Sequence, residues 1–191
     1  MRAGLLWLGA AALSACASYQ GSAHDVASSQ VVADPGWQRI DGVQWVRQKG
    51  TKDCGAAALS MVLEYWEQPR PAPAAERATI DAALRSSPSQ GLPAGELRDY
   101  ARRQGFQAYV FSGTLADLEH EIELQRPVIV GVHKQLSSRE ALAHYEVVVG
   151  LHAKRQLVLT LDPAHGLREN QLSAFLSEWE RAEHTTLVVM R

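Results

Sequence analysis

Three residues of this sequence carry side chains that together could transfer an acyl group: Cys54, His144 and Asp162. A thiolate is a strong nucleophile, and an imidazole can accept the thiol proton and later deliver a proton to a leaving amine. A carboxylate behind the imidazole holds the ring in one tautomer. This chemistry requires that the elements carrying the three residues meet in the fold.

Cys54 falls at the start of a segment with strong helical character. The run Gly55 to Trp66, GAAALSMVLEYW, predicts a helix with an apolar face, and Asp53 precedes it as a candidate cap. Cys54 then lies in the first turn, where the helix dipole and a nearby imidazolium both favour the thiolate. The charge of Asp53 opposes this effect unless backbone amides of the helix engage it.

His144 and Asp162 fall at the two ends of a predicted β-hairpin. Apolar residues alternate along two runs that flank the polar turn 152–156, and the pattern turns the odd-numbered residues toward the core: Val147, Val149, Leu151, Leu157, Leu159 and Leu161. The even-numbered residues His144, Glu146, Thr160 and Asp162 then share the opposite face. Folding the hairpin about Ala153 sets His144 directly opposite Asp162, and a bulge would slip this register by one. Glu146 on this face either tunes His144 or points to solvent.

The remaining periodic segments predict helices first and mainly strands later. Helices are predicted over Ala74 to Arg85, Ala94 to Gln104, Thr114 to Gln125 and Leu172 to Arg181, and strands over Phe106 to Phe111, Pro127 to His133 and Thr185 to Met190. This order favours an α+β domain. A helical lobe with the nucleophile would pack on an antiparallel sheet that carries His144 and Asp162.

The amino terminus has the features of an export signal. Arg2 precedes an apolar run from Leu5 to Leu13 that is too short to span a bilayer, and the run closes with LSAC, which resembles the lipobox of bacterial lipoproteins. We therefore expect residues 1–15 to be a lipoprotein signal peptide, with ordinary secretory cleavage as the alternative. Cys16 would carry the lipid, residues 16–40 would form a flexible tether, and residues 41–191 would form the domain.

Lipidation of Cys16 would leave Cys54 as a lone thiol in an oxidising compartment. Two interpretations are open for such a thiol. It is either buried as an inert, small apolar residue or kept as a nucleophile.

Composition excludes several classes of function. The chain has 46% hydrophobic and 21% charged residues, a net charge of -2 and a pI of 6.4, so no basic surface for nucleic acid is indicated. His133, His152 and His165 show no spacing typical of metal ligands, and neither a metal nor a cofactor is expected. Four tryptophans are expected to serve packing rather than to line a substrate channel: Trp37, Trp45, Trp66 and Trp179.

The segment from Gln48 through Cys54 to Leu59 resembles the active-site opening of the bacteriocin-processing, double-glycine-leader cysteine peptidases, a branch of the papain-like superfamily. Gln48 stands six residues before Cys54, as in that family. His144-Tyr145 before a valine-rich strand and Asp162-Pro163 after the next strand also match, and the likeness runs from about Val43 to the carboxyl terminus.

This resemblance implies a papain-like fold and a role for each site residue. Cys54 would be the nucleophile, His144 the general base and acid, and Asp162 the orienting carboxylate. The side-chain amide of Gln48 would donate to the oxyanion, a contact typically worth about 3 to 4 kcal/mol.

The expected function is that of a membrane-tethered cysteine peptidase acting on an exported polypeptide, with cleavage after Gly-Gly as one candidate specificity. The known members are intracellular domains fused to transporters, so a separate exporter is a candidate partner here. By resemblance to the sorting rules of Gram-negative lipoproteins, Ala17 after the lipidated residue favours the outer membrane, facing the periplasm. Two alternatives remain open: an amidase or transpeptidase acting on peptidoglycan, and a non-catalytic module that binds a secreted polypeptide.

Overall fold

Strand β5 (Ala141–His152) lies at the centre of the fold and pairs with three other strands. The computed structural model describes residues 22–50, 52–67, 91–137 and 140–191. Within these residues, an antiparallel sheet of eight strands has the order β1-β7-β6-β5-β4-β8-β3, with β2 paired to β5 beside this path. The other strands are β1 (His24–Asp25), β2 (Gln38–Arg39), β3 (Gln107–Ser112), β4 (Val128–Gln135), β6 (Leu157–Asp162), β7 (Gly166–Gln171) and β8 (Thr185–Met190).

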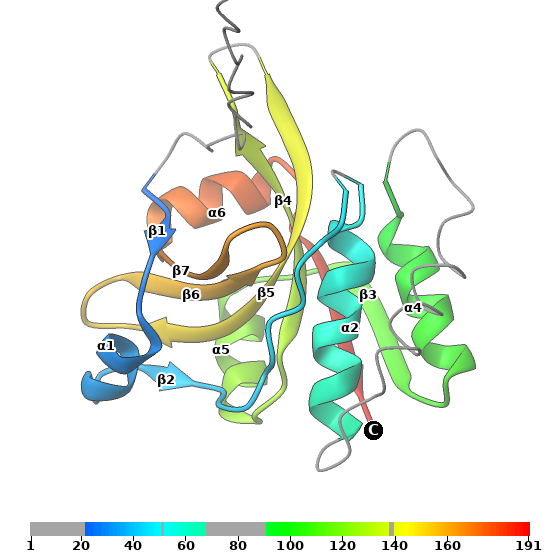
Figure 1. Cartoon of the computed structure of the whole chain (residues 1–191), viewed down its shortest axis with the longest axis horizontal. Coiled ribbons are helices and arrows are strands. Elements are labelled where there is room, and N and C mark those ends of the chain that lie inside the picture. Colours follow the sequence, from blue (N-terminus) through cyan, green and yellow to red (C-terminus); the bar gives the residue numbers. More distant parts are fainter. Residues whose placement is uncertain (1–21, 51, 68–90, 138–139) are drawn as a thin grey trace, which may run out of the picture.

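Helices cover both faces of this sheet (Figure 1). On one face, α2 (Cys54–Glu67) and α4 (Ala94–Arg103) lie next to each other and enclose a core with Val147 and Val149 of β5. On the other face, α5 (Leu115–Glu123) and α6 (Leu172–Glu180) enclose a second core with Val148. Successive residues of a strand point to opposite faces, so β5 is buried from both sides over this stretch.

Local sequence explains how helices α5 and α2 begin. Thr114 caps α5 by accepting a hydrogen bond from the Asp117 amide at 3.2 Å, and the Asp117 carboxylate accepts from the Thr114 amide in return. The small residues at the start of α2 allow a close approach to the sheet. A Cβ atom added to Gly55 would lie 3.2 Å from Cδ2 of Tyr145 on β5.

The predicted α+β class is confirmed, and most predicted elements are present. Helices α2, α4, α5 and α6 and strands β3, β4, β5, β6 and β8 fall within a few residues of their predicted bounds. The predicted helix from Ala74 to Arg85 lies outside the described residues. Strand β7 and the elements before residue 41 were not predicted, because they are short and their sequences lack a clear apolar period.

The prediction of a flexible tether up to residue 40 is wrong for residues 22–40. Strand β1 pairs with β7, helix α1 (Ser28–Ala33) follows it, and β2 pairs with β5. Val31, Trp37 and Ile40 are all buried against the sheet. These apolar residues are too widely spaced to show a helix or strand period, although their burial fixes the segment to the domain. The predicted signal peptide, Cys16 and residues 17–21 lie outside the described residues.

Among the described residues, none of the helices combines the length and hydropathy that crossing a bilayer requires.

Candidate active site

Cys54 is the first residue of α2, and its side chain lies at the wall of a cleft of about 390 Å³. The first amides of a helix lack partners within the helix and favour a negative charge, so this position supports a thiolate. The carbonyl of Asp53 accepts the bond from the Ala57 amide at 2.9 Å, which places Asp53 at the cap position as predicted. Its carboxylate, however, accepts from the Gly50 amide at 2.8 Å and so closes the turn before the helix.

His144 and Asp162 meet as predicted, although the predicted register of the hairpin is wrong. Val147 pairs with Leu161 and Val148 with Thr160, two residues away from the predicted pairing, and a bulge follows between Val148 and Gly150. The turn comprises residues 153–156, so its centre lies further along the chain than the predicted position at Ala153, and the Gln156 amide bonds back to the Ala153 carbonyl. A slip of two residues keeps the side chains before the bulge on their predicted face, so His144 and Asp162 still converge. Beyond the bulge the prediction is wrong for Leu151, which lies in the core of Val148 and not in that of Val147 and Val149.

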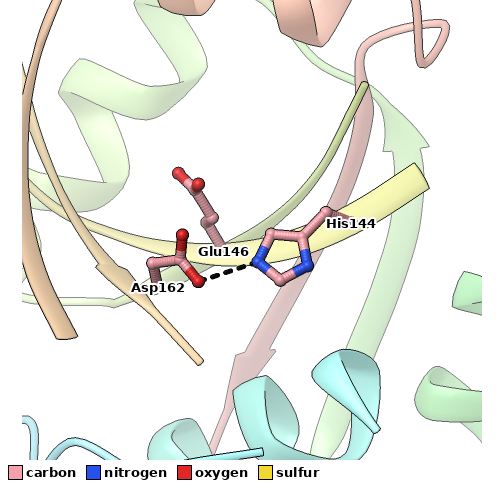
Figure 2. A group of neighbouring side chains, drawn as sticks. All are labelled: His144, Glu146 and Asp162. Atoms are coloured by element: carbon pink, nitrogen blue, oxygen red, sulfur yellow. Dashed lines mark hydrogen bonds and ion pairs between the residues drawn. The ribbon is translucent and has the colours of Figure 1, made fainter. Parts of the chain in front are cut away.

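The imidazole of His144 is buried and bonds to the carboxylate of Asp162, with 2.8 Å between Nε2 and Oδ1 (Figure 2). Oδ1 also accepts from the Ala164 amide at 2.7 Å. The carboxylate is thus fixed from two sides. Because Nε2 faces Asp162, the other ring nitrogen, Nδ1, is left for the sulfur of Cys54.

The charges of the site stabilise one another. Burial lowers the pKa of His144, but its hydrogen bonds with Asp162 and Cys54 and their charges outweigh this effect and raise the pKa to about 10. Burial also acts to raise the pKa of Asp162, yet the bond and charge of His144 keep that pKa below its ordinary value. At neutral pH these directions favour an imidazolium at His144 paired with the carboxylate of Asp162.

Tyr145, the neighbour of His144, is also affected by its burial and by Cys54. Burial and the charge of Cys54 raise the pKa of its phenol to about 12. The phenol therefore stays neutral beside the site over the ordinary pH range.

Gln48 lies on a segment that is tied to the end of β6, which we call the strap (Trp45–Gln48). The indole Nε1 of Trp45 donates to the Asp162 carbonyl at 2.8 Å, and the Gln48 amide donates to the Pro163 carbonyl at 2.9 Å. The Gln48 side-chain nitrogen donates to the Gly50 carbonyl at 3.0 Å. A primary amide has two N–H donors, and this bond uses one of them. Gln48 is not among the residues that line the cleft.

The walls of the cleft were not found from sequence. They come from Gly91 to Pro93, from β4 and β5, from Arg181 to Glu183, and from Thr185 at the start of β8. Gly131 of β4 faces Thr185 closely, and a Cβ atom added to Gly131 would lie 3.1 Å from Cβ of Thr185. The signal that could have found this wall is a glycine within an otherwise β-branched strand, which often marks a close approach.

None of the four tryptophans considered for the channel lines this cleft. Trp37 and Trp179 are buried in the two cores, and Trp66 donates from Nε1 to the Val189 carbonyl at 2.8 Å. Trp45 is 42% exposed and contributes to the strap instead. The predicted packing role is thus confirmed for three of them.

Glu146 is buried, so the alternative of a solvent-facing carboxylate is wrong. One ligand atom each of His144, Glu146 and Asp162 lie within 4.8 Å of one another, a spacing that could suit a metal ion (Figure 2). Glu146 already has a cationic partner, since its Oε1 lies 2.8 Å from Nζ of Lys134 on β4. Lys134, which the sequence analysis missed, lies 2.6 Å from Oε2 of Glu178 as well. We interpret this arrangement as an ion-pair cluster.

Comparison with known proteins gives one family and several related folds. The model of the Peptidase C39 family matches residues 42–189. No curated protein sequence matches the chain. Among solved structures, the peptidase domain of Streptococcus ComA, a bifunctional ABC transporter involved in quorum sensing, is 24% identical with a TM-score of 0.61 and covers 78% of this chain and 98% of its own.

Two further structures have a similar fold. A double-glycine-motif protease from an AMS/PCAT transporter, solved with its leader peptide, is 21% identical with a TM-score of 0.59 and covers 80% of this chain and 93% of its own. A C39-like peptidase from Bacillus anthracis is 12% identical with a TM-score of 0.62 and covers 80% of this chain and 96% of its own. At these identities the likeness shows a common fold.

Proposed function

Because this chain belongs to the Peptidase C39 family of cysteine peptidases, we propose that Cys54, His144 and Asp162 are its catalytic residues. The observation that carries this assignment is the position of His144. Its Nε2 bonds to Asp162, Cys54 acts on its pKa, and both His144 and Cys54 line the cleft.

In the first half of the reaction, with the proton of Cys54 already on Nδ1 of His144, the thiolate attacks the carbonyl carbon of the scissile peptide bond. The free N–H of the Gln48 side chain donates to the oxygen that becomes negative in the tetrahedral intermediate. His144 then gives its proton to the leaving amine as the C–N bond breaks, which leaves a thioester on Cys54.

In the second half, His144 takes a proton from a water molecule that attacks the thioester carbonyl. The C–S bond breaks, the new carboxyl group leaves, and the proton on His144 remains paired with the Cys54 thiolate. Asp162 stays ionised throughout and holds the ring so that Nδ1 faces the sulfur. The sum of the steps is hydrolysis of one peptide bond.

The substrate we propose is an exported polypeptide cleaved after two small residues, with Gly-Gly as the first candidate. Two observations support it. The cleft is narrow at Gly131, where Thr185 and Tyr145 leave little room beside the strand. One structural neighbour is a double-glycine-motif protease solved with its leader peptide.

A peptide panel tests this proposal. Peptides that differ only in the two residues before the scissile bond (Gly-Gly, Ala-Ala, Leu-Leu) are incubated with the wild-type chain and with Cys54→Ala, and products are identified by mass spectrometry. We expect Gly-Gly to be cleaved fastest and Cys54→Ala to be inactive. Purified sacculi form a second substrate arm, and turnover of sacculi alone would replace this proposal by a peptidoglycan-acting enzyme.

We also propose that residues 1–15 direct export and that lipid on Cys16 anchors the domain to the outer membrane, facing the periplasm. A separate exporter would then deliver the substrate. Since residues 22–40 pack on the domain, only about six residues would separate Cys16 from it, a span of about 20 Å at most. Labelling cells with a radioactive fatty acid checks the anchor, because Cys16→Ser should abolish incorporation and release the protein from the membrane fraction.

A further inference from the structure

Three charged side chains are buried directly behind the His144–Asp162 pair, and the steps above do not use them. Lys134 of β4 is 1% exposed, Glu146 of β5 is 2% exposed, and the side chain of Glu178 on α6 is 10% exposed. The ammonium of Lys134 lies 2.8 Å from Glu146 and 2.6 Å from Glu178. Burying three charges is costly unless they are paired, so the position of this cluster calls for a physical reason.

The cluster adjoins the site through Glu146. A carboxylate oxygen of Glu146 lies within 4.8 Å of both an Asp162 oxygen and a ring nitrogen of His144 (Figure 2). Oδ2 of Asp162 is buried and has no hydrogen-bond partner among the described residues. Two carboxylates this close in a poorly solvated place favour uptake of a proton by one of them. A protonated Asp162 would no longer stabilise the imidazolium of His144.

We propose that Lys134 is a positioning residue of the peptidase: it compensates Glu146 and thereby lets Asp162 remain an anion in its bond to His144. This inference rests on the proposed roles of His144 and Asp162. Glu146 acts in the same unit, since it carries the charge that Lys134 must balance.

The groups around the cluster are consistent with this role. Asp162 faces His144 and Glu146 on β5, and the charge of His165 also acts on it. On the far side, Glu178 faces Lys134, with Arg181 nearby. Burial lowers the pKa of Lys134, but Glu146 and Glu178 outweigh this effect and raise it, so the ammonium keeps its charge. Burial raises the pKa of Glu178, which makes Glu178 a readier proton acceptor than an ordinary glutamate.

Two substitutions move the charge beside Asp162 in opposite directions. Lys134→Met removes the cation and leaves Glu146 uncompensated, whereas Glu146→Gln removes the competing carboxylate and leaves Lys134 paired with Glu178. The pH dependence of Cys54 alkylation by iodoacetamide is measured on the 191-residue chain and needs no peptide substrate. The acid limb of this profile is the fall of the alkylation rate at low pH. Its midpoint should move up by about one pH unit in Lys134→Met and down by about half a unit in Glu146→Gln.

In the double variant Lys134→Met/Glu146→Gln, the midpoint of the acid limb should return toward that of the wild type. The acid limb of kcat on the cleaved peptide should shift in the same direction as that of alkylation in each variant, with KM unchanged. Lys154→Met, which removes an exposed charge in the β5–β6 turn, is the matched control and should leave the limb in place. If Lys134→Met fails to fold, Glu146→Gln alone tests the inference, because the acid limb of that variant would stay in place if the cluster were purely structural.

The inference is overturned if Lys134→Met and Glu146→Gln both keep the wild-type limb, or if both shift it the same way. These outcomes are distinct from failure of the proposed function. In that case the wild-type chain would cleave no peptide, or Cys54→Ala would cleave as fast as the wild type.

Discussion

Replacing Asp162 by Asn removes a charge from His144 while keeping an acceptor oxygen of the same shape. The two groups are 2.8 Å apart. At an effective dielectric constant of about 20, unit charges at that distance attract by about 6 kcal/mol, which corresponds to about four pH units in the titration of the ring. Part of this is recovered because the bond to the Asn oxygen and the charge of Cys54 remain. We therefore expect the pKa of His144 to fall from about 10 by at least about two pH units.

The assay is a pH titration of ¹⁵N-labelled histidine side chains by NMR, with the His144 signal assigned through His144→Ala. The sequence has seven histidines, so the spectrum is simple enough to resolve one ring. Asp41→Asn is the control, since the Asp41 side chain is 72% exposed and pairs only with Arg39 among the described ion pairs. If the His144 ring of Asp162→Asn still titrates near pH 10, the claim that the Asp162 carboxylate keeps this ring protonated is refuted.

Three further outcomes are expected. The pKa of His144 is raised on folding, so its contribution to stability is complete below about pH 6.5 and is lost toward pH 10, and the free energy of unfolding by urea should fall by a few kcal/mol across that window. Trp37→Ala should lower the free energy of unfolding by about 3 to 5 kcal/mol, whereas Val32→Ala at an exposed position should change little, because residues 22–40 belong to the fold. Gly131→Val should lower kcat/KM for Gly-Gly peptides yet leave alkylation of Cys54 by the small iodoacetamide intact, with Gly95→Ala on α4 as the control. Equal loss of alkylation and cleavage in Gly131→Val would point to a distorted site instead of a blocked cleft.

The contact between His144 and Asp162 could be predicted from sequence because it depends on strand parity. Residues an even number apart share a face whatever the register, so the pair survived an error of two residues in the pairing. The position of Cys54 at a helix start was equally local, since the small residues after it define α2. Which ring nitrogen of His144 bonds to Asp162 could not be predicted, because it depends on how the ring is oriented between the two strands and α2.

Features that depend on tertiary contacts could not be predicted from the sequence. Lys134 follows the end of a predicted strand, a position typical of a surface lysine. It is buried because α6 packs over β4 and brings Glu178 to its ammonium group. Val31 and Trp37 lie in a stretch rich in Ser, Ala and Gly, and their burial follows from pairing with β5 and β7, which are distant in sequence. The wall at Gly131 likewise depends on β8 approaching β4.

The bulge between Val148 and Gly150 divides the β5–β6 hairpin into two stretches of different register. The pairs on one side of it, Val147 with Leu161 and Val148 with Thr160, hold the imidazole and its carboxylate in line. The pairs on the other side lead to the exposed turn 153–156. That turn is therefore a suitable place to insert a purification tag or a fluorescent reporter, since extra length there would be absorbed before it reached the hydrolytic centre.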